Sequence, residues 1–424
     1  MSSPAIALLL TGHELMTGDT VDTNSAMISR HLLETGILVA EKCTVGDEPD
    51  ALKKSLMRLS QEYDGVIVNG GLGPTEDDLT ASIIADLCGA PLVENAEALA
   101  HVDAWCERRG IQANSANLKQ AWLPGNADLI PNPIGSAVGF SLSLGNCLVL
   151  TTPGVPSELE AMLPTVTAML VAAIGSSETF TQRIQTFGVG ESTIQQWANE
   201  LGDDWPSSVT LGFRAGLPQL ELKLTVAHAE QDPDQKPAYE LLVNRFGDHI
   251  LVEKDARLAQ VVQALLRDQK KTMTTAESCT GGLIASMVTR EPGSSAVFEA
   301  GLVTYANSAK SQLLGVEDDV LNTEGAVSEP VVRQMLLGAL ERAGADIGVA
   351  VSGIAGPDGG TADKPVGTVW IAWGTREDLR THRAQIPGSR SLFQGLVAAV
   401  ALDLIRRHLL GLPALPHYFT RQAQ

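Results

Sequence analysis

The stretch of sequence that decides the fold lies in the last third of the chain and reads TTAESCTGGLIASMV, from Thr274 to Val288. Its composition predicts a strand over Thr272–Thr275, a turn of small residues, and a helix over Gly282–Val288. This order of elements is typical of α/β proteins. Backbone amides from Thr280 to Gly282 would lie at the positive end of that helix, where they suit a phosphate or the oxyanion of acyl transfer.

A serine stands in this turn, and two interpretations of it stay open. Ser278 could raise its hydroxyl toward a ligand as a nucleophile, or it could cap the helix while the glycines serve packing. The adjacent Cys279 is a rival nucleophile. No histidine stands near it in any motif, which disfavours a cysteine mechanism.

Three more features lie downstream of the turn. Tyr305 ends an apolar run and Lys310 follows it, and a partly desolvated lysine can act as a base toward serine, although most lysines are simply solvated. A glycine-rich loop, Ser352–Gly360, permits close approach of the backbone to a ligand or is a surface loop. Arg390 stands at the start of the last helix and could present a guanidinium to a phosphate.

The rest of the chain shows the same alternation of elements. In the first part, short apolar strands end in glycine-rich turns and alternate with helices, which predicts a parallel α/β sheet with ligands at the carboxyl ends of its strands. These strands are predicted at Ala5–Leu10, Gly65–Val68 and Cys147–Leu150. The 424 residues are too many for one core, and we predict an α/β domain over 1–170, a small α+β domain over 171–253 and an α/β domain over 254–424.

Composition excludes several classes of protein. The formal net charge of −20 disfavours binding to nucleic acid, because a protein on a phosphate backbone needs a basic face. The five cysteines form no CxxC pair and fit reduced thiols in the cytoplasm. No stretch is expected to reach the length of about 18 apolar residues that a membrane span needs. We therefore expect a cytoplasmic protein with no membrane or nucleic-acid partner.

Five motifs in the last third, TTAESCTGG, GLVTYANSAK, GAVSEPVV, VSGIAGPDGG and KPVGTVW, resemble the C-terminal domain of the CinA family over roughly residues 256–415. The resemblance implies a nicotinamide-nucleotide amidase that converts nicotinamide mononucleotide and water to nicotinate mononucleotide and ammonia without a cofactor. By motif, Ser278 would be the nucleophile, Lys310 its base, and Tyr305 an aid to proton transfer or lysine orientation. The implied substrate-binding residues are Cys279, Thr280, Gly281, Gly282, Asn307, Ser352, Gly353 and Arg390.

The first domain carries its own group of glycines and carboxylates. Glycines in Gly12–Gly18 and in Asn69–Thr80 would let strand-end loops wrap phosphates. Acidic side chains in and near these loops could hold a divalent cation against a pyrophosphate, or could cap helices. The four candidate metal ligands are Glu14, Asp22, Asp77 and Asp78.

These loops, together with Asn132–Ala137 and Pro153–Glu158, resemble the N-terminal, molybdopterin-binding-like domain of the same family over about residues 5–170. The resemblance implies a divalent-metal-dependent ADP-ribose pyrophosphatase. His13, Asn69 and Val138 depart from the residues that the family usually has at these positions.

Three functions follow as hypotheses. The first is a two-site hydrolase of pyridine-nucleotide salvage that acts on nicotinamide mononucleotide and ADP-ribose. The second is an enzyme related to the molybdenum cofactor, and the third is a non-enzymatic competence or recombination adaptor. The family resemblance also leads us to expect a homodimer, formed through the middle domain.

Overall fold

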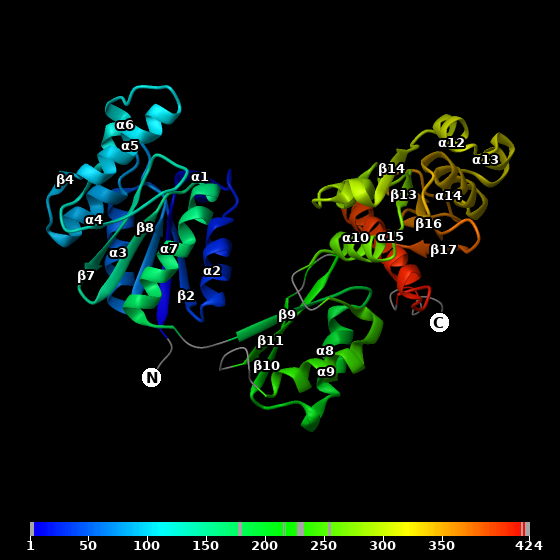
Figure 1. The fold of residues 1–424 in the computed structure, drawn as a ribbon, viewed down its shortest axis with the longest axis horizontal. Coiled ribbons are helices and arrows are strands. Elements are labelled where there is room, and N and C mark those ends of the chain that lie inside the picture. The colour runs from blue at the N-terminus through cyan, green and yellow to red at the C-terminus, as the bar shows by residue number, and fades with distance from the viewer. Residues whose placement is uncertain are drawn as a thin grey trace. The chain divides into compact units, whose positions relative to one another are not determined.

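The computed structural model describes residues 4–176, 180–214, 216, 218–226, 233–252, 256–416 and 419. These residues form two compact units, one ending at Phe180 and the other beginning at Thr181. Both units are built from sheets covered by helices, so the predicted α/β class is confirmed (Figure 1). Residues 253 and 254, where the sequence analysis divides the middle from the last domain, lie outside the described residues.

The first unit is organised around a six-stranded sheet in the order β2-β1-β3-β8-β7-β6. The first four strands of that order are parallel, as the sequence predicts, whereas β7 and β6 are antiparallel additions at one edge. The strands are β1 (Ala5–Thr11), β2 (Leu38–Val45), β3 (Gly65–Asn69), β6 (Asp128–Ile130), β7 (Gly139–Leu144) and β8 (Cys147–Thr152).

Helices cover both faces of this sheet because alternate residues of each strand point to opposite sides. Ala7 and Leu9 of β1 pack with α3 (Pro49–Glu62) and α4 (Thr80–Cys88). The neighbours of these residues on β1 pack on the other face against α2 (Asn24–Glu34) and α7 (Pro156–Ile174). The unit also contains α1 (His13–Thr17), α5 (Ala96–Arg108), α6 (Ser115–Lys119), and a two-stranded sheet of β4 (Leu92–Glu94) and β5 (Trp122–Pro124).

Helix α7 is long and apolar enough to span a membrane, with 19 residues and a mean hydropathy of 1.4. The expectation that no stretch reaches this threshold was therefore wrong. In the structure, one face of α7 is buried in the sheet core through Leu159, Met162 and Val166. Core helices commonly pass the same test, so the observation is weak evidence for a membrane span. Residue 170, the predicted end of the first domain, lies inside this helix.

A small four-stranded sheet, in the order β10-β11-β9-β12, opens the second unit. The predicted hairpin is present as the antiparallel pair β10 (Val209–Arg214) and β11 (Leu220–Val226). The remaining elements are β9 (Phe180–Thr186), β12 (Ile250–Val252), α8 (Glu191–Asn199), α9 (Gln235–Phe246), and the short helices η1 (Gly202–Asp204) and η2 (Gly247–His249).

A five-stranded sheet in the order β14-β13-β15-β16-β17 forms the rest of the second unit. The three strands β14, β13 and β15 are parallel, and β16 and β17 continue the sheet in antiparallel fashion. Their bounds are β13 (Met273–Glu277), β14 (Phe298–Val303), β15 (Ile347–Gly353), β16 (Thr368–Gly374) and β17 (Leu379–Gln385).

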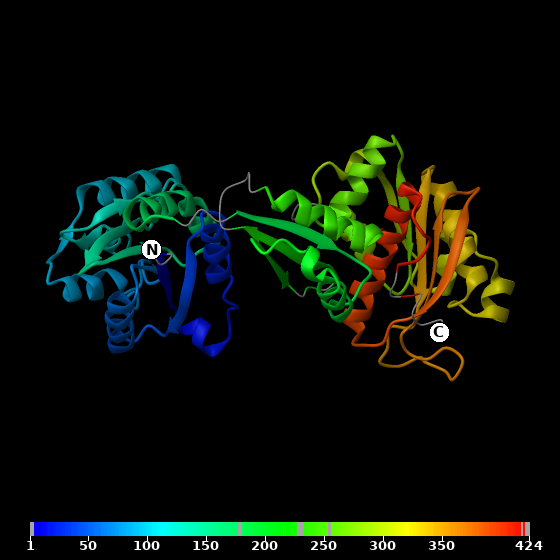
Figure 2. The same ribbon diagram turned by 90° about the horizontal axis from the view of Figure 1, so that it is seen from below.

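Two layers of helices enclose this sheet (Figures 1 and 2). One face packs against α10 (Leu258–Asp268), α11 (Leu283–Thr289) and the 21-residue α15 (Arg390–Leu410). The other face packs chiefly against α14 (Glu329–Ala343). Helices α12 (Asn307–Leu314) and α13 (Asp318–Glu324) lie beside α14. The short helix η3 (Ser294–Ala296) precedes β14. Because β13, β14 and β15 are parallel, the residues after each strand meet at one edge of the sheet.

Candidate active site

A cavity of 260 Å³ lies at the carboxyl ends of β13, β14 and β15. Residues from five separate segments line it, and it is the place in the second unit where the predicted amidase residues meet. Its lining consists of Ser278, Cys279, Tyr305, Asn307, Lys310, Ala326, Val327, Ser352, Gly353, Ile354, Ala355, Gly356, Asp358, Gly359 and Arg390. Thr280, Gly281 and Gly282 do not line it.

The structure brings the predicted nucleophile and base together. Ser278 directly follows β13, and Lys310 lies on α12, the helix that follows β14. The Nζ atom of Lys310 is 3.2 Å from the Oγ atom of Ser278. Lys310 is only 1% exposed, and burial lowers the pKa of its ammonium group. The alternative of an ordinary solvated lysine is therefore wrong.

The other contacts of Lys310 can be made by a neutral amine as well as by an ammonium group. Its Nζ atom donates to the carbonyl oxygens of Thr304 at 2.9 Å and of Tyr305 at 3.2 Å. A neutral amine has two hydrogens and one lone pair. Two hydrogens satisfy the two carbonyls, and the lone pair is then available to accept a hydrogen bond from the Ser278 hydroxyl. The site thus holds a lysine that can take a proton from the serine.

Tyr305 and Arg390 form a second pair at the rim of the cavity. The guanidinium of Arg390 donates to the phenol oxygen of Tyr305 at 3.1 Å and to the carbonyl oxygen of Gly356 at 3.0 Å. Tyr305 contacts Lys310 through its main-chain carbonyl, while its phenol is turned toward Arg390. Within the described part of the chain, no carboxylate forms an ion pair with Arg390, so its charge is available to an anion.

A buried carboxylate that the sequence analysis did not single out shapes the nucleophile turn. Glu277 is 0% exposed. Its Oε2 atom accepts hydrogen bonds from the Thr280 hydroxyl at 2.6 Å and from the amides of Gly282 at 3.0 Å and Ile284 at 3.1 Å. Its Oε1 atom accepts from the amide of Ala285 at 2.8 Å. The free amides at the positive end of α11 are therefore bound by a carboxylate of the protein itself.

This arrangement corrects one prediction. The amide of Gly282 serves Glu277, and the amide of Gly281 donates to the carbonyl oxygen of Ser278 at 3.2 Å. Neither amide is free for a ligand, so the prediction that they bind one is wrong. Both glycines have positive φ angles, 64° and 99°, which side chains disfavour. Their role is to let the chain turn tightly around Glu277.

The rival nucleophile is unsuited to the reaction. Cys279 is 3% exposed, and burial raises the pKa of its thiol to about 12. A thiol with this pKa is almost entirely protonated at neutral pH, and the thiolate is the reactive form. The carbonyl oxygen of Cys279 accepts a hydrogen bond from Gln394 of α15 at 2.8 Å. Cys279 thus supports the turn beside Ser278.

Other predicted substrate-binding residues complete the wall. Asn307, Ser352 and Gly353 all line the cavity. The hydroxyl of Ser352 donates to the carbonyl oxygen of Ala326 at 2.7 Å, which ties the end of β15 to the loop before α14. A Cβ atom on Gly353 would lie 2.8 Å from the carbonyl oxygen of Thr368, so the β15–β16 contact requires glycine there.

A second candidate site lies in the first unit, in a cavity of 510 Å³ at the carboxyl ends of β1, β3 and β8. We call it the glycine-lined cavity because Gly12, Gly70, Gly71, Gly73 and Gly154 contribute to its wall. The carboxylates in its lining are Glu14, Asp47, Asp77, Asp78 and Glu158. Asp47 lies outside the stretches that the sequence analysis quoted, and Glu158 ends one of them, Pro153–Glu158, but was not named as a candidate ligand.

The predicted four-carboxylate metal site is not formed. Among the described residues, no three His, Cys, Asp or Glu side chains lie close enough together to bind a metal ion. Asp22 does not line the cavity, and it accepts hydrogen bonds from the amide of Ser25 at 2.9 Å and from the Ser25 hydroxyl. Asp78 accepts from the amide of Thr75 at 2.9 Å. Asp22 thus binds an amide in the first turn of α2, which is the capping alternative, whereas Asp78 holds the loop before α4.

One departure from the family pattern has a structural role. Asn69, at the end of β3, donates to the hydroxyl of Thr152 at 3.0 Å and to the carbonyl oxygen of Pro153 at 2.7 Å. It accepts from Asn24 at 2.9 Å. This buried network fixes the loop after β8 at the wall of the glycine-lined cavity.

Known proteins match both units. A model of a probable molybdopterin binding domain matches residues 7–172, and a model of the CinA C-terminal domain matches residues 255–409. A CinA-like protein of Colwellia psychrerythraea is 45% identical over 429 residues, which is 100% of this chain and 99% of that protein. A CinA-like protein of Geobacter metallireducens is 41% identical over 411 residues, with 96% and 99% covered.

Among solved structures, the competence/damage inducible protein CihA from Agrobacterium tumefaciens is 42% identical and covers 35% of this chain and 92% of its own, with a TM-score of 0.35. Folds and matches together define an α/β protein that joins a molybdopterin-binding-like N-terminal part to a CinA C-terminal domain. The chain belongs to the CinA family.

Proposed function

We propose that the second unit is a nicotinamide-nucleotide amidase that converts nicotinamide mononucleotide to nicotinate mononucleotide and ammonia. The observation that carries the proposal is the buried contact between Lys310 and Ser278, at 3.2 Å, beside a cavity. The charges of the lining also suit this substrate. Arg390 is available to the phosphate, and Asp358 can face the positively charged pyridinium ring.

In the proposed reaction, Lys310 accepts the hydroxyl proton of Ser278 while the serine oxygen attacks the carboxamide carbon. The oxyanion that forms needs hydrogen-bond donors. Cys279 directly follows Ser278 and lines the cavity, and we assign its amide this role. The Lys310 ammonium then protonates the amide nitrogen, which leaves as ammonia. Water, losing a proton to Lys310, hydrolyses the acyl-serine and releases the carboxylate.

The test is ammonia release from nicotinamide mononucleotide by the purified full-length chain, with and without EDTA. We expect release that EDTA does not affect and that Ser278→Ala abolishes. Ser295→Ala is a matched control, since this exposed serine lies in η3 and does not line the cavity. Absence of release by the wild type would contradict the proposal, as would full activity in Ser278→Ala.

A second proposal concerns the first unit, where we infer an ADP-ribose pyrophosphatase. The observation that favours it is the glycine-lined cavity, whose close main-chain approaches suit phosphate groups. The described residues make no metal site by themselves. We therefore propose that a divalent ion enters with the nucleotide, since Mg²⁺ in such sites takes part of its ligands from substrate phosphates.

This second activity is tested by following the formation of AMP from ADP-ribose, with Mg²⁺ and with EDTA. We expect EDTA to abolish it and Ser278→Ala to leave it unchanged. Glu14→Gln should reduce it, because Glu14 lines the cavity. Glu34→Gln, at the end of α2 and outside the cavity, is the control. Formation of AMP at the same rate in EDTA would overturn the metal requirement.

A further inference from the structure

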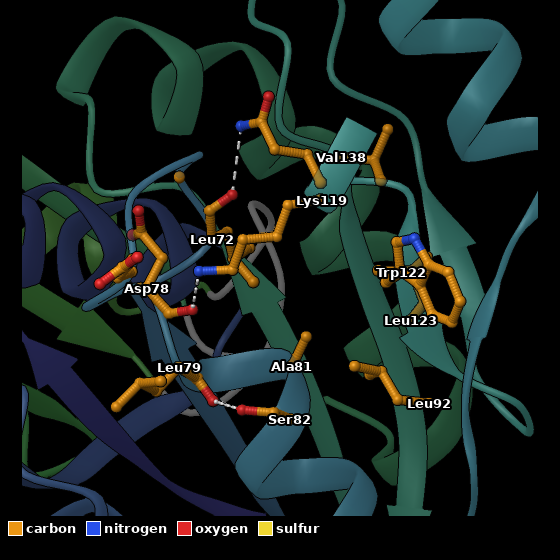
Figure 3. Close-up of a pocket in the computed structure, with 14 residues that line it drawn as sticks. Leu72, Asp78, Leu79, Ala81, Ser82, Leu92, Lys119, Trp122, Leu123 and Val138 are labelled. Atoms are coloured by element: carbon orange, nitrogen blue, oxygen red, sulfur yellow. Dashed lines mark hydrogen bonds between the residues drawn. The ribbon is translucent and has the colours of Figure 1, made fainter. Parts of the chain in front are cut away.

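A smaller cavity of 290 Å³ adjoins the glycine-lined cavity in the first unit (Figure 3). We call it the Trp122 compartment. The two hollows share part of their wall, including Gly71, Leu72, Gly73 and Gln120. A ligand that places phosphates in the glycine-lined cavity could therefore extend a further group into the Trp122 compartment. The shared glycine loop would lie beneath the junction of the two parts.

The lining of the Trp122 compartment is mostly apolar and includes one aromatic plane. Trp122 of β5 is 43% exposed, an unusual fraction for a side chain of this size. Leu92 lies near it, and Ala81 and Ser82 from the start of α4 lie across the hollow (Figure 3). These two residues are small and leave a slot opposite the indole. A flat aromatic group fits such a slot and would stack on the indole.

The walls of this slot are fixed in place. The Nζ atom of Lys119 donates to the carbonyl oxygen of Asp78 at 3.0 Å and to that of Thr75, so it holds the loop before α4. The hydroxyl of Ser82 donates to the carbonyl oxygen of Leu79 at 2.9 Å. On the opposite side, β4 and β5 pair in antiparallel fashion. A preformed pocket loses little entropy when a ligand enters.

The wall that the two cavities share carries an unsatisfied polar group. Gln120 is 7% exposed, and its Nε2 atom donates to the carbonyl oxygen of Leu72 at 3.3 Å. Its Oε1 atom is buried without a hydrogen-bond partner in the described structure. Unpaired buried acceptors are rare in native proteins. A small rotation of the amide, which loses only a long hydrogen bond, would present this oxygen to a donor on a ligand.

We propose that the Trp122 compartment binds the planar base of a nucleotide whose phosphates lie in the glycine-lined cavity. The inference rests on the proposed phosphate-binding role of that cavity, and it adds the recognition of a base to it. Stacking on Trp122 supplies the affinity, and Gln120 supplies an acceptor for an exocyclic amino group or a hydroxyl. Bare pyrophosphate and sugar phosphates would leave the compartment empty.

The experiment compares ADP with inorganic pyrophosphate by calorimetric titration of the full chain in Mg²⁺. We expect Trp122→Ala to weaken ADP binding about 10-fold, in line with stacking energies, and to leave pyrophosphate binding unchanged. Trp122→Phe should keep most of the ADP affinity, since the plane remains. Ala81→Leu, which fills the slot, should weaken ADP binding by at least the same factor. Ile111→Ala, an exposed apolar residue outside the compartment, is the control.

Equal ADP affinity in wild type, Trp122→Ala and Ala81→Leu would overturn the inference, and so would a wild type that binds pyrophosphate but not ADP. Thermal unfolding of each variant separates these outcomes from misfolding. Failure of the proposed pyrophosphatase activity can be distinguished from failure of base recognition. If Trp122→Ala weakens ADP binding but the wild type does not cleave ADP-ribose, base recognition stands and the pyrophosphatase does not. If Trp122→Ala cleaves ADP-ribose with an unchanged KM, the pyrophosphatase stands and base recognition by the Trp122 compartment does not.

Discussion

The Nζ atom of Lys310 lies 3.2 Å from the Oγ atom of Ser278, and the two side chains are 1% and 8% exposed. The lysine has no ion-pair partner among the described residues, and burial is the largest influence on its pKa, which it lowers. A buried lysine without a counter-charge is costly in its charged form. Burial without a counter-charge therefore destabilises the folded protein, and it also favours the neutral amine that can act as a base.

The first prediction is that deamidation of nicotinamide mononucleotide rises with pH as Lys310 loses its proton. The midpoint should lie below 10.5, the ordinary value for lysine, because burial lowers the pKa. The measurement is the pH profile of kcat/KM. Lys310→Arg should be inactive at every pH, since a guanidinium keeps its proton. A variant with arginine that retains the wild-type profile would remove Lys310 from the mechanism.

The second prediction concerns stability. Between the lowered pKa of Lys310 and the ordinary value of 10.5, which applies to the unfolded chain, the unfolded state binds more protons than the folded state. Stability must then rise with pH across that window. Lys310→Met keeps the length of the side chain and removes the charge. We expect the free energy of unfolding of the wild type, relative to this variant, to increase with pH. Urea unfolding at several pH values measures it, and parallel curves for the two proteins would contradict the prediction.

The third prediction is that Glu277→Gln lowers kcat with little change in KM. The carboxylate accepts hydrogen bonds from the Thr280 hydroxyl and from three main-chain amides, and an amide NH₂ in place of one oxygen would meet donors. Each buried donor left unsatisfied costs about 1–3 kcal/mol. Glu277 acts by positioning Ser278, so the loss should appear in turnover. Steady-state kinetics and urea unfolding report the two effects.

Glu299→Gln provides the control for this prediction, since Glu299 is an exposed residue on the edge strand β14. It should change neither kcat nor stability. If Glu277→Gln raises KM and leaves kcat intact, Glu277 shapes the substrate pocket and not the nucleophile turn.

The fourth prediction is that Arg390→Ala raises KM for nicotinamide mononucleotide at least about 10-fold, because a charge-assisted contact contributes about 1.5–3 kcal/mol. Nicotinamide riboside, which lacks the phosphate, should be handled equally by wild type and variant. Arg376→Ala, an exposed arginine in the β16–β17 turn, serves as the control. An equal loss on both substrates would indicate that Arg390 acts only by holding Tyr305, to which it donates at 3.1 Å.

The sequence predicted the parallel core of the first unit because its strands are continuous apolar runs, as in β3, and it predicted the α/β class of the last third. It missed β2 and β17, whose residues alternate with charged ones. LVAEKCTV and LRTHRAQ look polar because these strands lie at sheet edges, where one face or one side is open to solvent.

For the site, the sequence brought Ser278 and Lys310 together through their motifs, but it could not show which way the amides of the turn point. That direction depends on Glu277, a carboxylate that becomes informative only when its burial is known. The metal site of four carboxylates in the first unit was predicted wrongly for a related reason. The contacts of Asp22 with Ser25 and of Asp78 with Thr75 are local, and a pattern of carboxylates near glycines does not distinguish such contacts from metal binding.

The fifth prediction concerns the anchor at the far end of α15, the helix that begins with Arg390. Asp403 is 0% exposed and accepts from Arg406 at 2.8 Å and from Arg407 at 2.6 Å. Arg407 also pairs with Asp248, in the small sheet's half of the unit. Removing one partner of a buried ion pair costs about 3–5 kcal/mol, because the remaining charges stay buried. We therefore expect Asp403→Ala to lower the free energy of unfolding by at least this amount.

The matched control for this prediction is Asp378→Ala, which removes a carboxylate that pairs with Arg380 at 2.8 Å but is 51% exposed. An exposed pair contributes about 0–1 kcal/mol, so the two aspartates should differ by several kcal/mol in urea unfolding. Replacing Asp403 and both arginines with apolar residues of similar size should recover much of the loss, because no buried charge is then unpaired. If Asp403→Ala is no more destabilising than Asp378→Ala, water reaches the cluster and it does not anchor α15.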